Sequence, residues 1–193
     1  MKSSIACINA HIPQVCALLF SLWTACAASA SSPSDARLFS GLQVGLVKQA
    51  HDAGMRYLNL QNAIEDGYVP ATGCVSGDAG GAMGVHYVKP ALLGDGRVDP
   101  ALPEALVYEP GRYGGLNLVA VEYMVFSAAW HASHDTPPVV TGQAMDLMGE
   151  PNRYAIPAVY ELHVWAFRDN PNGMFASFNP RVTCENYDPP AAP

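Results

Sequence analysis

The chain has 193 residues, of which 50% are hydrophobic and 14% are charged, and its formal net charge at pH 7 is −7. This length suits one domain with a buried core once an export signal is removed. An acidic surface repels the phosphate backbone, so the charge argues against nucleic acid as a partner.

The N-terminal segment, residues 1–30, has the three parts of a secretory signal peptide. A positive start at Lys2 is followed by an apolar run over residues 15–25 and by small residues up to Ala30. The run is shorter than the roughly 20 residues of a membrane-spanning helix, and the A-x-A patterns near Ala30 fit signal-peptidase cleavage. We therefore predict export to the periplasm or the medium, with lipid attachment at Cys26 as the alternative. No later apolar run predicts a membrane span.

Two cysteines, Cys74 and Cys184, remain after the signal. In an oxidising compartment such a pair most simply forms a disulfide, which the loop-entropy model values at about 4–5 kcal/mol. The alternative, a reactive thiol at Cys74, requires a reduced cysteine where oxidation is the rule. We predict a single domain over residues 31–187 and a disordered tail over residues 188–193.

A helical pattern opens the domain, between Leu38 and Asp66. Apolar residues such as Leu46, Ala50 and Ala53 recur at spacings of three and four. Gly67 then provides a helix end. The pattern predicts an amphipathic helix that packs on a sheet.

Strand patterns alternate with turns along the rest of the chain. Short runs of β-branched and aromatic residues predict strands over residues 84–88, 105–109, 116–126 and 159–167. Residues 127–157 are read as a long irregular segment across one mouth of the sheet, where ligand covers occur. We predict an α+β fold, with the N-terminal amphipathic helix on a mainly antiparallel, curved or barrel-like sheet. A β-sandwich with the helix at one end is the alternative.

Glu122 is the most unusual residue of the predicted strands. Both faces of the strand over residues 116–126 are apolar, and Glu122 shares one of them with Leu118, Ala120, Met124 and Phe126. A buried carboxylate is costly unless it is paired or protonated. Glu122 is therefore expected to have a partner or to be protonated.

Three further residues on separate strands supply the partners. These residues and Glu122 form one predicted set: His86, Glu109, Glu122 and His163. Two imidazoles and one or two carboxylates that point into one cavity would bind zinc, manganese or non-haem iron. The chain after the signal contains no H-x-H, H-E-x-x-H or C-x-x-C motif, so the prediction depends on strand positions alone.

Two other interpretations of the set stay open. Glu122 and His163 can form a buried structural pair, or the residues can form a metal-free acid/base site. The function follows the same division. The protein is either an exported metal protein that acts on or binds a small molecule, or a non-catalytic binding or structural protein. The sequence identifies no catalytic residue and no oligomeric state.

Several segments together resemble an uncharacterised family of small secreted bacterial proteins. They are Gly67-Tyr68, Gly81–Val88, Leu106–Pro110, Val119–Tyr123, Glu161–Trp165 and Asn170–Phe175. The resemblance covers nearly all of the chain after the signal. It implies one domain and export, and it supplies no activity or site residue.

Overall fold

The computed structural model describes residues 33–77 and 80–188 of the chain. The predicted signal peptide, residues 1–30, lies outside these ranges, as do residues 189–193 of the predicted tail over 188–193. None of the helices in the described ranges has the length and apolar character that a membrane crossing requires.

The helical segment at the start of the domain is divided into three pieces. They are α1 (Pro33–Gly54), the 3₁₀ helix η1 (Met55–Leu58) and α2 (Leu60–Glu65). Gly54 lies at the division, where a Cβ atom would be 2.6 Å from a ring carbon of Phe167. A larger residue would force the Phe167 ring to move, and α1 ends at this glycine. The predicted single helix was therefore too long.

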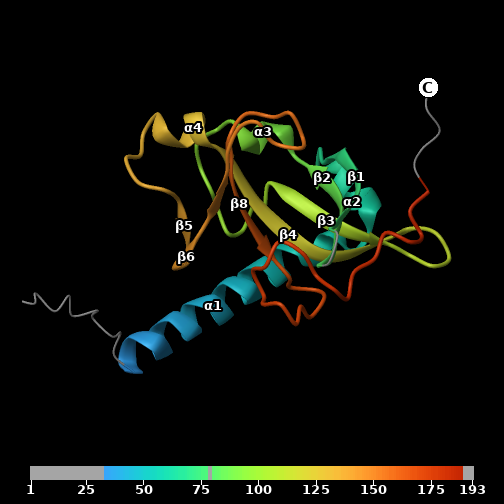
Figure 1. The fold of residues 1–193 in the computed structure, drawn as a ribbon, viewed down its shortest axis with the longest axis horizontal. Helices are drawn as coiled ribbons and strands as arrows, with labels where there is room; N and C mark the ends of the chain where they lie inside the picture. Colours follow the sequence, from blue (N-terminus) through green and yellow to red (C-terminus); the bar gives the residue numbers. More distant parts are fainter. Residues whose placement is uncertain (1–32, 78–79, 189–193) are drawn as a thin grey trace, which may run out of the picture. The chain divides into compact units, whose positions relative to one another are not determined.

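Six strands form one sheet, in the order β1-β2-β3-β4-β8-β7, and every pairing is antiparallel. The strands are β1 (Val69–Gly77), β2 (Gly81–Val88), β3 (Ala105–Pro110), β4 (Leu116–Phe126), β7 (Asp146–Met148) and β8 (Val159–Val164). The sheet curls strongly into half a barrel (Figure 1). The smaller elements are α3 (Pro90–Leu93), α4 (Ser127–His131) and the two-stranded β5 (Val139–Val140) with β6 (Gln143–Ala144). The predicted α+β fold, a helix on a curved antiparallel sheet, is confirmed.

The sequence analysis missed β1 and β7 of this sheet, as well as the short β5 and β6. β1 contains Pro70 and Gly73, which are poor strand formers, but β1 is an edge strand, where proline is tolerated. β7 is only three residues long and lies inside the segment that was read as irregular. β8 ends at Val164, three residues earlier than predicted.

One face of the sheet packs against α1. Leu46 and Ala50 of the helix are fully buried together with Val121, Tyr123 and Val125 of β4. Burial of this apolar surface is the main force that holds the helix on the sheet. The opposite face of the sheet is left free to carry polar side chains.

An irregularity in β4 decides which residues reach that opposite face. The pairing with β3 skips Val119, because consecutive β3 residues pair with Ala120 and Leu118. The extra residue reverses the alternation at this point. Leu118 therefore joins the core on the α1 side instead of sharing a face with Ala120 and Glu122, as the regular alternation had predicted.

The C-terminal segment is covalently joined to the sheet. Cys74 of β1 and Cys184 form a disulfide, with their Cα atoms 5.7 Å apart and a sequence separation of 110. The predicted pairing is confirmed.

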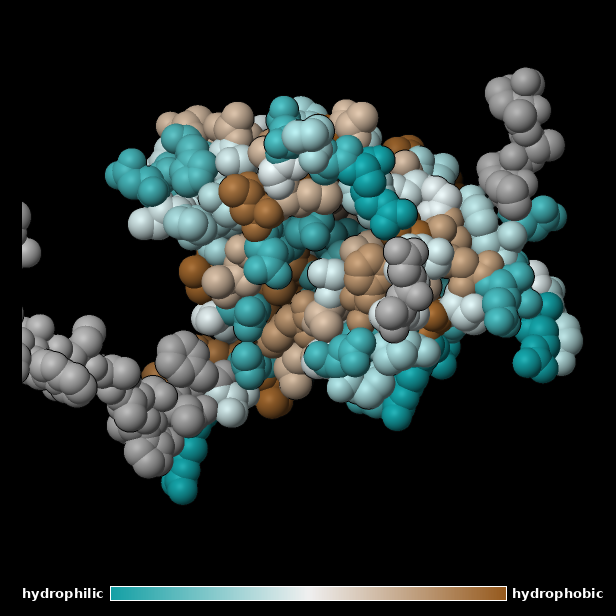
Figure 2. All heavy atoms as spheres, viewed as in Figure 1, coloured by the Kyte–Doolittle hydropathy of each residue, from teal (hydrophilic) through white to brown (hydrophobic). Residues whose placement is uncertain are grey.

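On the face shown in Figure 2, hydrophobic residues appear in small separate groups among hydrophilic ones.

Candidate metal site

A row of paired residues across four strands forms the base of the site. Val88 of β2 pairs with Ala105 of β3, Ala105 pairs with Glu122 of β4, and Glu122 pairs with His163 of β8. Residues paired in this way point to the same side of a sheet. The small side chain of Ala105 leaves space above β3. His86, two residues before Val88 on the same strand, extends into this space.

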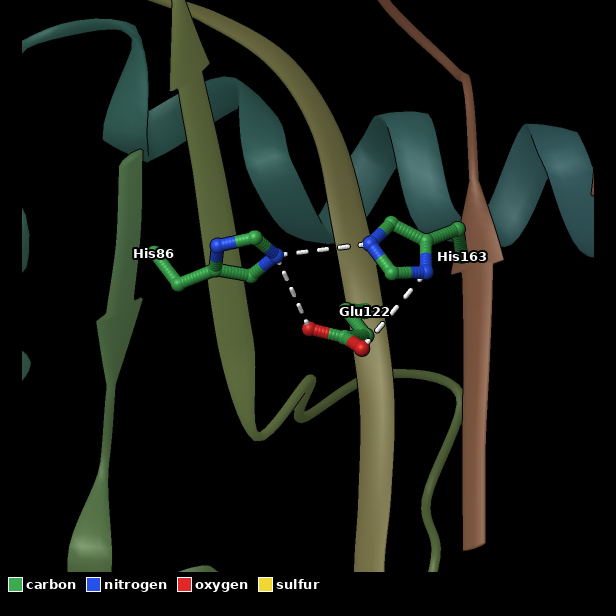
Figure 3. Close-up of side chains that lie close together, drawn as sticks. All are labelled: His86, Glu122 and His163. Carbon is green, nitrogen blue, oxygen red and sulfur yellow. Dashed lines mark hydrogen bonds and ion pairs between the residues drawn. The ribbon is translucent and has the colours of Figure 1, made fainter. Parts of the chain in front are cut away.

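Three residues of the predicted set, His86, Glu122 and His163, meet on the sheet face opposite α1 (Figure 3). His86 Nε2 lies 3.4 Å from His163 Nε2 and 3.5 Å from Glu122 Oε2. His163 Nδ1 lies 3.5 Å from Glu122 Oε1. All three residues are at most 6% exposed. One potential ligand atom from each residue lies within 4.8 Å of the others, so the group could hold a metal ion.

The separations within the group are longer than those of good direct hydrogen bonds. In a tetrahedral zinc site the ligand atoms, each about 2.1 Å from the metal, lie about 3.4 Å apart. His163 faces His86 with Nε2 and Glu122 with Nδ1, so its ring must adjust before one of its nitrogens shares an ion with both partners. Good hydrogen bonds to nitrogen are usually about 2.7–3.2 Å long. Glu122 Oε2 is buried and has no hydrogen-bond partner among the described residues. A buried carboxyl oxygen is rarely left in this state, and a cation would satisfy it.

Burial disfavours the charged form of all three groups. It raises the pKa of Glu122 well above its usual value, and the charges of Glu161 and Glu104 add to this effect. Burial lowers the pKa of His86 to about 4. Burial, followed by the neighbouring His86, lowers the pKa of His163 to about 3. Neutral imidazoles are the form that binds metals, so only Glu122 must release a proton.

The orientation of His86 is set by a bulge in β1. Pro70 pairs with Tyr87 and Cys74 pairs with Val85, so three β1 residues lie opposite the single residue His86. The middle residue of the three is Thr72. Its Oγ1 lies 3.2 Å from His86 Nδ1 and accepts a hydrogen bond of 3.3 Å from the His86 backbone N–H. When His86 Nδ1 donates its proton to this hydroxyl, the lone pair of Nε2 faces Glu122 and His163.

The site adjoins a cavity of about 520 Å³. Its lining includes all three residues of the group, together with Thr72 and a majority of apolar side chains. This volume falls within the roughly 300–1,000 Å³ that is usual for small-molecule pockets. Part of the wall comes from Met148 to Ile156, within the segment that the sequence predicted as a cover.

Glu109, the fourth member of the predicted set, lies elsewhere. Glu109 of β3 pairs with Asn117 of β4. It lies four residues after Ala105, the β3 residue that pairs with Glu122. Its carboxylate forms an ion pair with Arg168 and accepts a hydrogen bond from the backbone N–H of Thr183. Glu109 does not line the cavity. The structure therefore brings together His86, Glu122 and His163 and gives Glu109 a different set of partners.

Thr72 is the site residue that the sequence analysis missed. A threonine in a segment with proline and glycine gives no signal of its own, because its role depends on the bulge opposite His86.

No protein-family model, curated protein or solved structure matches the chain. The resemblance to a secreted family therefore stays a prediction, and the function must be argued from the site.

Proposed function

We propose that the protein binds one divalent metal ion through His86, Glu122 and His163. The observation that carries this proposal is the buried Glu122 Oε2, which lacks a hydrogen-bond partner among the described residues while two imidazole nitrogens lie 3.5 Å from its carboxylate. Two histidines and one carboxylate form the ligand set of catalytic zinc sites and of non-haem iron sites.

Such a centre keeps a coordination position for another molecule. Three protein ligands leave the fourth position of a tetrahedral ion free, and the three side chains line the cavity. A divalent ion at this position activates water or polarises a carbonyl group. We therefore assign the cavity to a small molecule that the metal binds or acts on.

We further propose that the protein works outside the cytoplasm, in the cell envelope or the medium. Support comes from the signal-peptide pattern of residues 1–30 and from the disulfide between Cys74 and Cys184. Disulfides persist in oxidising compartments. The mass of the protein from a cell-envelope fraction tests this: cleavage near Ala30 is expected, and an intact N-terminus would contradict it. An added lipid mass at Cys26 would identify the alternative anchoring.

The alternative is a structural group without a metal. The neutral states of His86, Glu122 and His163 favour it, because three neutral buried groups can persist without a cation. In that case the group only specifies the packing of β2, β4 and β8. Removal of one member would then cost about 1–3 kcal/mol of stability, because its partner would be left buried and unpaired.

Metal content separates the two functions. The mature protein and its His163→Ala and Glu122→Gln variants are incubated with zinc, manganese or ferrous ions, desalted and subjected to elemental analysis. His131→Ala is the matched control, because His131 is an exposed histidine that bonds Tyr160 outside the site.

We expect one equivalent of metal in the wild type and in the control, and little in the two site variants. Metal should also raise the wild-type melting temperature, since a hundredfold excess over the dissociation constant stabilises the folded state by about 2.7 kcal/mol. Equal, negligible metal content in all four proteins would support the structural group instead.

A further inference from the structure

The walls of the cavity select the kind of molecule that reaches the metal. Apolar side chains from five segments of the chain make up most of these walls, among them Met83, Leu93, Met124, Phe126, Met148 and Ile156. Water cannot form hydrogen bonds with apolar walls, so an aliphatic group of matching shape is favoured there. At roughly 30 Å³ for each water molecule in the liquid, the cavity has room for a ligand of about 15 non-hydrogen atoms.

The charges along the cavity favour an anionic head group at the buried end. With a divalent ion bound, the two neutral imidazoles and the Glu122 carboxylate leave one net positive charge at the site. An oxygen anion in the free coordination position would neutralise that charge in a region of low dielectric constant. Among the described residues of the lining, Arg153 is the one side chain with a permanent positive charge, and it is exposed. The strongest attraction for an anion is therefore at the metal and not at the mouth.

We propose that the cavity binds aliphatic monocarboxylates of about six to ten carbons, with the carboxylate on the metal and the chain against the apolar walls. This inference rests on the proposed metal centre. Glu161 also lines the cavity and opposes an anion. Because Glu161→Gln removes this negative group, it should strengthen carboxylate binding.

Calorimetric titration of the zinc-loaded protein with acetate, butanoate, hexanoate, octanoate and decanoate tests the proposal. We expect the association constant to rise about fourfold for each added methylene group, until the chain fills the cavity. Removal of zinc with a chelator should weaken octanoate binding by at least tenfold. Octanol should bind the zinc-loaded protein at least tenfold more weakly than octanoate.

Two variants test where the aliphatic chain of the ligand binds. Ile156→Asn should reduce the gain between butanoate and octanoate, whereas Leu147→Asn should not, because Leu147 is 55% exposed and outside the cavity lining. Both variants should bind zinc as the wild type does.

The outcomes distinguish this inference from the proposed function. Failure of the wild type to take up zinc would overturn both. If zinc binds but the affinity is independent of chain length, or if octanoate and octanol bind equally, only the carboxylate proposal is overturned. The same holds if octanoate binds equally with and without zinc, which would place the head group away from the metal.

Discussion

Replacement of Thr72 by valine tests whether the β1 bulge prepares His86 for a metal. Valine keeps the branched shape of threonine and removes the hydroxyl. That hydroxyl contacts both His86 Nδ1 and the His86 backbone N–H, at 3.2 and 3.3 Å. His86 is 6% exposed, so water cannot readily replace the lost partner.

The expected effects follow from these two contacts. A buried donor left without a partner costs about 1–3 kcal/mol, so the free energy of unfolding of the metal-free Thr72→Val protein should fall by that amount. Loss of a residue that orients a metal ligand usually weakens metal binding about 10–100-fold. Zinc affinity should fall within this range, because the His86 ring is no longer held with Nε2 toward Glu122.

Urea denaturation of the metal-free protein and calorimetric zinc titration measure the two effects. Thr72→Ser is the matched control, because it keeps the hydroxyl and should bind zinc nearly as the wild type does. If the valine and serine variants have the same zinc affinity, Thr72 does not orient His86 and the role assigned to the bulge is wrong.

Three further predictions concern residues around the site. Replacement of Cys74 and Cys184 by serine should lower the free energy of unfolding by about 4–5 kcal/mol in urea, and the unreduced mature wild type should show no titratable thiol. Burial raises the pKa of Glu104 from 4.5 to about 8. The folded state therefore binds more protons than the unfolded state between these values, and stability falls as pH rises through this window. The advantage of Glu104→Gln over wild type should grow by up to about 1.4 kcal/mol per pH unit in denaturation curves; a constant difference would refute this. Glu109→Gln should lower stability by about 1–3 kcal/mol and leave zinc affinity unchanged, whereas Glu122→Gln should abolish binding; a weaker zinc affinity in Glu109→Gln would make Glu109 a ligand.

The sequence was most informative where alternation is regular. Glu122 among apolar residues of β4 and His163 on β8 could both be placed on strands from the period-two pattern, and both lie at the site. A continuous helix was predicted where α1 ends at Gly54, because helical spacing continues through the 3₁₀ turn that follows.

The remaining errors have a common physical cause. The extra residue Val119 in β4 and the bulge around Thr72 in β1 each depend on a partner strand, and local sequence does not record that partner. Glu109 is an instructive case, because its strand was found while its partners, Arg168 and Thr183, lie about sixty and seventy residues later. Strand membership alone could not separate a metal ligand from an anchor of the C-terminal segment.

The wide spacing of the site along the chain imposes an order on its biosynthesis. Synthesis from the N-terminus produces Thr72 and His86 early, but His163 is added only near the end, and Cys184 later still. Until then, a growing chain contains an incomplete ligand set and cannot form the covalent link that holds β1. The proposed metal site therefore lacks its third ligand until β8 has been synthesised, and any metal loading through it must come after that point.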